Sequence, residues 1–408
     1  MTPAGVVVAG AGQAGFQVAV TLRKAGYEGP VRIVGEEAAP PYQRPPLSKA
    51  FMLADDGPET VHLRPASFYA KQSIELIGGD RVERADRSEQ RIELASGGGL
   101  DYDHLVLALG SRPRALRVPG AELDGVHDLR TLADAQAIRD RLATARRVVV
   151  VGGGFIGLEF ASSASKRGAA VTVIEALERP MARVVSPEMS DFYVRLHGEA
   201  GVEILLATGV EELTGEDGRV TGVRTADGRA LEAELVLAGI GVVPNTEPAA
   251  ASGLVIDDGI VVDEQLVTAD PAISAVGDCA AFLRHGRRVR LESVQNAVDH
   301  ARCAGARIAG SPAPYTALPW FWSDQHDTKL QIAGIATTRE RAVVRGDVDA
   351  GAFSVFCFTD DRLIAVESVN SPRDHMAARG LLAAAPDLTP DEAADPSFDL
   401  KARAQAAS

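Results

Sequence analysis

The segment that decides the fold is Val6–Phe16, which reads VVVAGAGQAGF. An apolar, β-branched run enters a glycine turn, and an amphipathic segment follows, so the pattern predicts a strand, a loop and a helix. The helix is expected to end near Gly26, and a second strand is expected at Val31–Val34. Glu36 stands about 20 residues beyond Gly15, where an acidic residue can bind the ribose of a dinucleotide.

The three glycines of this turn have separate physical roles. Gly10 permits the tight turn, Gly12 lets the backbone approach a pyrophosphate, and Gly15 lets the helix pack closely on the strand. An isolated glycine turn would not also place a strand, a helix, a second strand and an acid in register. The stretch therefore predicts a dinucleotide-binding unit.

The same pattern returns in the segment Val148–Glu159, which reads VVVVGGGFIGLE. The glycines of its turn are Gly152, Gly154 and Gly157. A helix is expected to about Gly168, then a strand at Val171–Ile174, then Glu175. Two fingerprints in one chain predict two dinucleotides, and this pairing suggests electron transfer between a bound FAD and an exchangeable nicotinamide.

Glu175 predicts which nicotinamide dinucleotide binds. A carboxylate at the end of this strand accepts hydrogen bonds from both ribose hydroxyls and repels a 2′-phosphate, which favours arginine instead. NADH is therefore expected in preference to NADPH. Arg179 and Arg183 follow and would weaken that preference if they met the phosphate. We interpret them instead as solvated side chains or as contacts to the pyrophosphate.

Composition narrows the class of protein. The chain has 408 residues, 46% of them hydrophobic and 24% charged, which is typical of a soluble protein of two or three domains. Its 42 Lys and Arg residues against 56 Asp and Glu give a net charge of −14. This balance argues against nucleic acid as a partner, because duplex binding needs a cationic face. It is compatible with a local basic patch for an acidic protein.

The cysteines and the apolar runs indicate a cellular location. Cys279, Cys303 and Cys357 are far apart, so neither a redox disulfide nor a metal site is expected. An odd number of cysteines fits a reducing compartment. No secretory signal is recognised, and the apolar runs are too short to span a membrane. We therefore expect a cytoplasmic protein.

The region from about Tyr315 onward differs from the two repeated units. The cluster Trp320–Trp322 is followed by short β-like runs, which predict an antiparallel sheet. Just before this region, Ser293 is expected to cap a helix that continues to about Arg302. The fold class predicted is α/β, with two Rossmann-like dinucleotide-binding domains and a C-terminal α+β domain.

Nearly the whole chain resembles the FAD-dependent NADH:ferredoxin reductases of bacterial oxygenase systems, of the putidaredoxin reductase and palustrisredoxin reductase type. Besides the two fingerprints, the marks are PYQRPPLSK at Pro41–Lys49, LRT at Leu129–Thr131, VGD at Val276–Asp278, ESVQN at Glu292–Asn296 and WFWSD at Trp320–Asp324. The resemblance implies a glutathione reductase-like fold. The implied domains are an FAD-binding domain in two parts (1–113 and 241–314), an NAD-binding domain (114–240) and a C-terminal domain (315–408).

Matching positions imply the site residues. The implied FAD site includes Gly10, Gly12, Ala14, Gly15, Glu36, Arg44, Lys49, Val82, Arg130, Asp278 and Val294. The implied NAD site includes Gly152, Gly154, Gly157, Glu159, Glu175 and the turn Gly239–Gly241. Asp278 is expected to accept a hydrogen bond from the ribityl chain.

Three residues are predicted to serve catalysis: Lys49, Glu159 and Trp320. Hydride transfer needs two oriented, dry rings and no covalent step. Lys49, paired with Glu159, would stabilise negative charge on reduced flavin; the alternative is a surface lysine after a Pro-Pro turn. Trp320 would exclude water near the flavin–nicotinamide contact, whereas Phe321 or Trp322 is expected in a core.

One departure from the disulfide reductases of this fold points to the acceptor. The stretch around Arg44–Lys49 carries no redox cysteine pair, so electrons are expected to leave the flavin singly for an outside acceptor. The leading hypothesis is a [2Fe–2S] ferredoxin that supplies a haem monooxygenase or similar oxygenase. We expect docking near Arg302 and Arg307, with Arg44 and Arg64 as further candidates, on a monomer or weak homodimer.

Two alternatives remain at this point. One is a rubredoxin reductase or an NADH oxidase on the same fold, which only acceptor rates would distinguish. The other is a flavoprotein binding module in which NADH controls oligomerisation or partner choice. Slow ferredoxin reduction together with an NADH-dependent change of oligomeric state would support the binding module.

Overall fold

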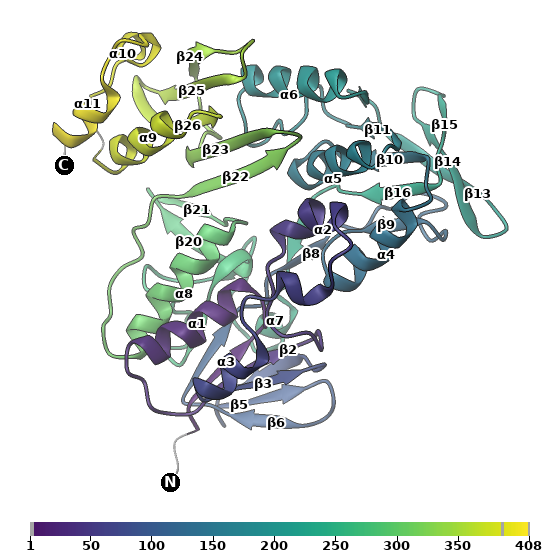
Figure 1. The fold of residues 1–408 in the computed structure, drawn as a ribbon. Helices are drawn as coiled ribbons and strands as arrows, with labels where there is room; N and C mark the ends of the chain where they lie inside the picture. The colour runs from purple at the N-terminus through teal and green to yellow at the C-terminus, as the bar shows by residue number, and fades with distance from the viewer. Residues whose placement is uncertain (1–3, 385–386, 407–408) are drawn as a thin grey trace. The chain divides into compact units, whose positions relative to one another are not determined.

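The computed structural model describes residues 4–384 and 387–406, which fold into two compact units (Figure 1). The first unit contains the chain up to Gln43, Gly57–Arg112 and Val242–Ala317. The second contains Arg44–Asp56, Pro113–Gly241 and the chain from Leu318 onward. The fold is of the glutathione reductase-like α/β class, as predicted, and it repeats one Rossmann-like sheet in the two units.

The first unit is built on a five-stranded parallel sheet in the order β19-β7-β1-β2-β3. Its strands are β1 (Val6–Ala9), β2 (Val31–Gly35), β3 (Ile74–Gly78), β7 (His104–Leu107) and β19 (Ile273–Ala275). All four residues of β1 are buried, as expected for a central parallel strand with both faces covered. Helix α1 (Gln13–Lys24) follows β1 and packs along α8 (Val294–Ile308).

Smaller elements complete the first unit. The antiparallel sheet β4-β5-β6 and the sheet β18-β20-β21 flank it, and β8 pairs with β17 where the chain leaves and re-enters. The strands are β4 (Val82–Asp86), β5 (Arg91–Leu94), β6 (Gly99–Asp101), β8 (Ser111–Pro113), β17 (Val242–Pro244), β18 (Ile260–Val261), β20 (Ala280–Arg284) and β21 (Arg287–Val289). The helices are η2 (Pro58–Val61), α3 (Ala66–Lys71), α7 (Glu247–Ala251) and η3 (Gly277–Cys279).

The second unit repeats the parallel sheet, in the order β12-β11-β10-β16-β9. Its strands are β9 (Val126–Asp128), β10 (Arg147–Val151), β11 (Ala170–Ile174), β12 (Val202–Leu205) and β16 (Leu235–Ala238). The helices are α4 (Leu132–Leu142), α5 (Phe155–Lys166) and α6 (Pro187–Glu199). A meander of β13 (Val210–Glu216), β14 (Arg219–Thr225) and β15 (Ala230–Glu232) adjoins the sheet.

The C-terminal region of the second unit contains the predicted antiparallel sheet, in the order β22-β23-β26-β25-β24. Its strands are β22 (Trp320–Gln325), β23 (Thr328–Gly334), β24 (Arg341–Asp347), β25 (Ala352–Thr359) and β26 (Arg362–Val369). Helices α9 (Pro372–Ala384), α10 (Pro390–Ala394) and α11 (Leu400–Ala406) pack on it through a core that includes Phe356, Val366 and Leu381.

The short segment Arg44–Asp56 packs within the second unit, although the chain on either side of it belongs to the first. It forms η1 (Pro45–Ser48) and α2 (Ala50–Leu53). Arg167 Nε donates to the carbonyl of Met52 at 2.6 Å, and the Arg139 guanidinium lies 4.3 Å from the centre of the Phe51 ring. These contacts fix the segment that carries Lys49 against α4 and α5.

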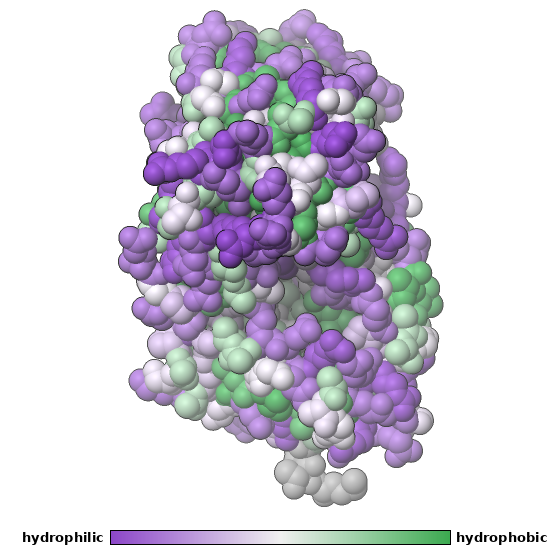
Figure 2. All heavy atoms as spheres, turned by 90° about the vertical axis from the view of Figure 1, so that its right-hand side faces the viewer, coloured by the Kyte–Doolittle hydropathy of each residue, from purple (hydrophilic) through white to green (hydrophobic). Residues whose placement is uncertain are grey.

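The predicted domain boundaries after residues 113, 240 and 314 stay predictions. Among the described residues, no helix combines the length and the apolar character that crossing a membrane requires. Hydrophilic side chains cover most of the face shown in Figure 2, and hydrophobic side chains form small groups between them.

Candidate functional site

The first glycine turn has the geometry that its fingerprint predicts. Gly10 has φ 119°, and a Cβ there would lie 2.1 Å from the carbonyl oxygen of Ala108, so only glycine fits. Gly15 meets the strand so closely that a Cβ would lie 1.9 Å from the carbonyl oxygen of Gly10. Gly12, the N-cap of α1, faces open space instead, which leaves room for a phosphate at the helix N-terminus.

Glu36 follows β2 directly and is accessible to a ligand, because 72% of its side chain is exposed. Its Oε1 lies 3.5 Å from Arg81 Nη1, and Val82 begins β4 next to that arginine. The Val82 side chain is buried in the core of the unit. The structure therefore places Glu36 and Val82 on neighbouring segments.

The last part of the first unit returns to the first turn. Gly277 comes so close to α1 that a Cβ would lie 3.2 Å from the Cβ of Ala14, and it would also contact Ala297 of α8. This close packing gathers Ala14, Asp278 and the start of α8 in one place, although about 260 residues or more separate Ala14 from the other two in sequence. Ser111 Oγ donates to Asp278 Oδ2 at 2.9 Å, which holds that carboxylate.

Helix α8 begins as predicted, because Ser293 Oγ accepts a hydrogen bond from the amide of Asn296 at 3.1 Å. Val294 is therefore the first residue of the helix, where the free amides and the helix dipole carry positive charge. The helix is longer than predicted and continues to Ile308.

The second turn repeats the first in detail. Gly152 has φ 108°, and a Cβ there would lie 2.4 Å from the carbonyl oxygen of Gly239. A Cβ on Gly157 would lie 2.1 Å from the carbonyl oxygen of Gly152, whereas Gly154, the N-cap of α5, faces open space. Gly241, with φ 101°, ends the facing turn. The residues around both turns fit the pyrophosphates of two dinucleotides.

Glu175 is held against this turn. Its Oε2 accepts from the amide of Gly153 at 2.7 Å, and its Oε1 accepts from the amide of Leu177 at 2.8 Å. The carboxylate thus lies beside the glycine turn, where the fingerprint requires the ribose-binding acid. Leu177 and Val184 on the following loop are 47% and 41% exposed, and such an apolar surface suits an adenine ring.

Arg179 holds the loop that follows Glu175. Its guanidinium donates to the carbonyls of Val185 and Ala182, at 2.9 and 2.8 Å, and to Ser190 Oγ at 2.8 Å. It therefore braces the loop and is not a solvated side chain. Arg183 is exposed, and a Cβ on Gly241 would lie 3.4 Å from its Nη2.

Lys49 and Glu159 form an ion pair in the second unit, with Nζ 2.9 Å from Oε2. Lys49 is therefore not a free surface lysine, since only 18% of its side chain is exposed, and Glu159 is 5% exposed. Ser48 Oγ donates to Glu159 Oε2 at 2.5 Å, and Ser323 Oγ donates to Oε1 at 2.7 Å. These donors compensate for the burial of the carboxylate.

Two further predicted cofactor residues, Arg44 and Arg130, belong to the same unit as this pair. Arg44 starts the segment that carries Lys49, and its Nη1 donates to the backbone carbonyl of Arg130. The second unit therefore gathers Arg44, Lys49 and Arg130, while the other predicted FAD residues belong to the first unit. Their roles toward the cofactor stay predictions.

Trp320 begins β22 and is partly exposed. Its ring packs on Trp322, with 5.5 Å between centroids, and the Arg379 guanidinium lies 5.2 Å from its centre. Phe321 packs on Phe155 at the start of α5, with 4.6 Å between centroids. Phe321 and Trp322 are also partly exposed, so the expectation that one of them belongs to a buried core is wrong. A strand at the sheet edge leaves these rings accessible.

Cys279 is the buried small hydrophobic residue that the sequence predicts. Its side chain is 0% exposed, and burial raises the pKa of its thiol to about 11. The three cysteines are unpaired.

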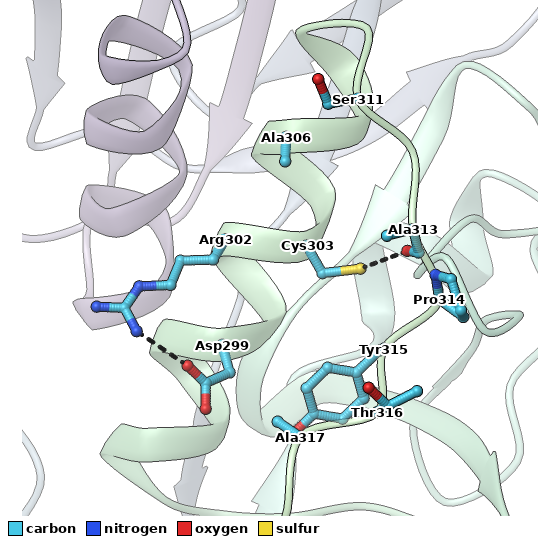
Figure 3. Close-up of a pocket in the computed structure, with 10 residues that line it drawn as sticks. All are labelled: Asp299, Arg302, Cys303, Ala306, Ser311, Ala313, Pro314, Tyr315, Thr316 and Ala317. Carbon is cyan, nitrogen blue, oxygen red and sulfur yellow. Dashed lines mark hydrogen bonds and ion pairs between the residues drawn. The ribbon is translucent and has the colours of Figure 1, made fainter.

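The two arginines expected to dock a partner differ in availability. Arg302 has an exposed side chain and pairs with Asp299 one turn earlier, at 3.2 Å (Figure 3). Arg307 is half-buried, and its Nη2 donates to Ser274 Oγ at 2.6 Å within the unit. Desolvation by burial lowers the pKa of Arg307. Arg302 is therefore the better placed of the two to meet another protein.

Arg302 borders a shallow pocket on the outer face of α8, which Figure 3 shows in close-up. The loop that follows α8 forms the opposite wall of the pocket. Cys303 Sγ on the helix donates to the carbonyl of Ala313 on this loop at 3.4 Å. Tyr315 closes one end of the pocket.

Comparison with known proteins identifies the family. Residues 4–301 match the model described as pyridine nucleotide-disulphide oxidoreductase. The chain belongs to the pyridine nucleotide-disulphide oxidoreductase family. Residues 320–404 match a second model, described as reductase C-terminal. Enzymes of this family use FAD and NAD(P)H, and the two glycine turns of this chain fit both dinucleotides.

Individual relatives match over nearly the full length. Rhodocoxin reductase of Rhodococcus erythropolis is 52% identical, covering 97% of this chain and 93% of the relative. The solved ferredoxin reductase for the CYP199A2 system from Rhodopseudomonas palustris is 48% identical, with a TM-score of 0.96 and 99% of each chain covered. The reductase in a solved covalent putidaredoxin reductase–putidaredoxin complex is 42% identical, with a TM-score of 0.96 and coverage of 99% and 98%.

Sequence reasoning missed the side chains that surround the ion pair. Ser48, Ser323 and Gln325 are buried polar residues with specific partners, yet none of these residue types marks a site. The only available signal is the spacing of Ser323 and Gln325, because alternate residues of a strand share one face.

Proposed function

We propose that this chain is an NADH-dependent ferredoxin reductase. FAD, when bound, would supply the redox chemistry that couples one hydride from NADH to the reduction of two [2Fe–2S] ferredoxin molecules in turn. The ferredoxin would supply a haem monooxygenase or a similar oxygenase. The observation that carries the proposal is the pair of complete dinucleotide turns in a chain whose cysteines are all unpaired. With no disulfide to receive an electron pair, the acceptor lies outside the chain.

The chain's own residues support the proposal by binding and orientation. Gly12 and Gly154 leave space for the pyrophosphates at two helix N-termini, and Glu175 stands ready for a ribose. Lys49, held by Glu159, supplies a positive charge that stabilises reduced flavin, and Trp320 excludes water from the hydride path. The 48% identity to a solved ferredoxin reductase for the CYP199A2 system supports the proposal of a ferredoxin reductase.

A ferredoxin docks, on this proposal, at a local basic surface of an otherwise acidic enzyme. Arg302 is the exposed candidate, whereas Arg307 is held by Ser274. We propose a cytoplasmic monomer or weak homodimer. Arg302→Glu should raise the KM for ferredoxin and reduce the salt dependence of ferredoxin reduction, without changing flavin reduction by NADH. An unchanged KM and salt dependence would remove Arg302 from the docking surface.

Anaerobic stopped-flow absorbance tests the proposal. The FAD-loaded protein is mixed with NADH and then with an oxidised [2Fe–2S] ferredoxin. Rapid flavin bleaching followed by rapid ferredoxin reduction is expected. Bleaching with no ferredoxin reduction, but rapid reduction of rubredoxin or oxygen, would overturn the assignment of the acceptor. No bleaching with NADH would overturn the proposal itself.

A further inference from the structure

A chain of buried hydrogen bonds runs from the Lys49–Glu159 pair through the second unit. Glu159 Oε1 meets Ser323 Oγ at 2.7 Å, and Ser323 Oγ meets Gln325 Nε2 at 3.1 Å. Gln325 Oε1 meets His197 Nε2 at 2.9 Å, and His197 Nδ1 meets His326 Nε2 at 3.2 Å. Ser323, Gln325 and His197 are each 0% exposed.

The single hydroxyl hydrogen of Ser323 fixes the direction of every hydrogen bond in this network. In its ion pair with Lys49, the Glu159 side chain acts as an acceptor of hydrogen bonds. Ser323 has a single hydroxyl hydrogen, so it must donate to Glu159 and accept from Gln325. The amide nitrogen of Gln325 then faces Ser323, and its oxygen must accept from His197.

The same logic sets the tautomer of His197. Its Nε2 carries the hydrogen that Gln325 accepts, so in a neutral ring its Nδ1 is bare and accepts from His326. Burial lowers the pKa of His197. The pKa of His326 is lowered to about 4, mainly by burial and further by its neighbours His197 and Lys166. Both rings are therefore neutral near pH 7, as the chain requires.

The far end of the chain is anchored by backbone contacts. His326 lies in the turn between β22 and β23 with φ 51°; its amide donates to Ser162 Oγ at 2.7 Å, and its carbonyl accepts from Lys166 Nζ at 2.9 Å. Both partners lie on α5, the helix that carries Glu159. The network therefore joins α5, α6 and β22 around one carboxylate.

We propose that Ser323, Gln325 and His197 are positioning residues that orient the Glu159 carboxylate and thereby hold Lys49 for hydride transfer. The inference rests on the proposed function, because it places the Lys49–Glu159 pair at the flavin. Among the described residues, Ser323 is the one that donates to Oε1, so its loss frees the carboxylate to rotate away from Lys49. Gln325 and His197 act through Ser323, because the amide that Gln325 donates leaves the Ser323 hydroxyl directed at Glu159.

Nitrogen-15 NMR of the FAD-loaded protein with labelled histidine tests the direction of the chain without any turnover. Near pH 7, His197, identified by the signal lost in His197→Gln, is expected as the Nε2–H tautomer. Ser323→Ala should give a mixture of tautomers, because Gln325 loses its hydroxyl acceptor and is left with the weak thioether acceptor of Met181 at 3.9 Å. An Nδ1–H tautomer in the wild-type protein, or an unchanged tautomer in Ser323→Ala, would overturn the inference.

Stopped-flow reduction by NADH tests the consequence. Ser323→Ala should slow the limiting rate of flavin reduction about tenfold, the size expected for losing a hydrogen bond to a charged group, with a smaller change in the NADH concentration at half-maximal rate. Ser323→Thr, which keeps the hydroxyl, should restore most of the rate. Gln325→Met offers a second break in the chain and should act in the same direction.

Ser354→Ala is the matched control, because Ser354 is also a fully buried serine of the C-terminal sheet and bonds to Ser368 instead. It should leave the rate unchanged. If the flavin of the wild-type protein is not reduced by NADH, the proposed function is wrong. The NMR experiment still tests the direction of the buried hydrogen bonds in that case. If the wild type is reduced rapidly and a folded Ser323→Ala is equally fast, the positioning role is wrong.

Discussion

Glu175 is a carboxylate whose position is set by backbone amides. The amides of Gly153 and Leu177 hold its two oxygens, so the protein by itself holds the side chain beside the glycine turn. A 2′-phosphate brought to this position would meet a fixed negative charge. Arg179 offers no compensation, because the loop uses its guanidinium for bonds to Val185, Ala182 and Ser190.

Glu175→Ala should therefore erode the preference for NADH over NADPH. We expect kcat/KM for NADH to fall about tenfold, since the ribose loses hydrogen bonds to a charged group, while the value for NADPH rises. Steady-state rates with both nucleotides measure the change. Arg179→Lys is a structural control that should lower stability without altering the ratio. A wild-type enzyme that favoured NADPH would contradict the assignment of Glu175.

The turn between β10 and α5 contains glycines with two different roles. One allows close packing of the strand and the helix, and the other leaves space for a ligand. A Cβ on Gly157 would lie 2.1 Å from the carbonyl oxygen of Gly152, so the strand and the helix would have to move apart. A Cβ on Gly154 would meet nothing within 4 Å in the protein, and its cost would arise only with ligand. The two positions therefore distinguish packing from binding.

Gly154→Ala should keep the melting temperature of the wild type within a few degrees and raise the KM for NADH at least tenfold, because the methyl group enters the space for the pyrophosphate. Gly157→Ala should lower the melting temperature. Thermal unfolding and steady-state kinetics on both variants are the measurements. Equal melting temperatures and equal KM values for the two variants would contradict this division of roles.

Ser293 caps α8 directly before Val294, a predicted FAD-binding residue. Ser293 Oγ accepts from the amide of Asn296, so Ser293→Ala leaves that amide without its partner. The free energy of unfolding should fall by about 1 kcal/mol, measured by urea denaturation. Ser293→Asn keeps a capping oxygen and should retain most of the stability. A drop as large in Ser293→Asn as in Ser293→Ala would show that the cap is not the cause.

Across the whole molecule, buried histidines make stability depend on pH. Burial lowers the pKa of His300 to about 3 and, with neighbouring charges, lowers those of His326 and His375 to about 4. The unfolded chain takes up a proton on each near pH 6.5, while the native protein does not. Stability is therefore greatest above pH 6.5 and is lost as the pH falls from there toward 4.

Removing one such group should flatten this dependence. His300 is 0% exposed, and its Nδ1 accepts from the amide of Gly277 at 3.2 Å, a bond that a glutamine can imitate. In His300→Gln, the stability lost between pH 7.5 and pH 5 should shrink by up to about 2 kcal/mol. Urea denaturation at both pH values measures it, with His285→Gln as an exposed control. An unchanged loss would mean that other groups dominate.

Local patterns gave the two dinucleotide units, because each depends on contacts among neighbours in sequence. The turn at Gly10–Gly15, the cap at Ser293 and the β-like runs of the C-terminal region are all recognised from residue types over short stretches of sequence. The pairing of Lys49 with Glu159 was also predicted, and the structure places Lys49 Nζ 2.9 Å from Glu159 Oε2. What these residues do toward FAD and NADH stays a prediction.

Three features were decided only by the tertiary structure. The segment Arg44–Asp56 packs within the second unit, Arg179 braces its own loop, and Glu159 heads a buried chain that reaches His326. Ser48 and Glu159 are 111 residues apart, and Ser323 is 164 residues from Glu159. The sequence by itself determines the units whose contacts are local. Contacts between distant residues depend on how the formed elements pack, because no local spacing or residue type encodes them.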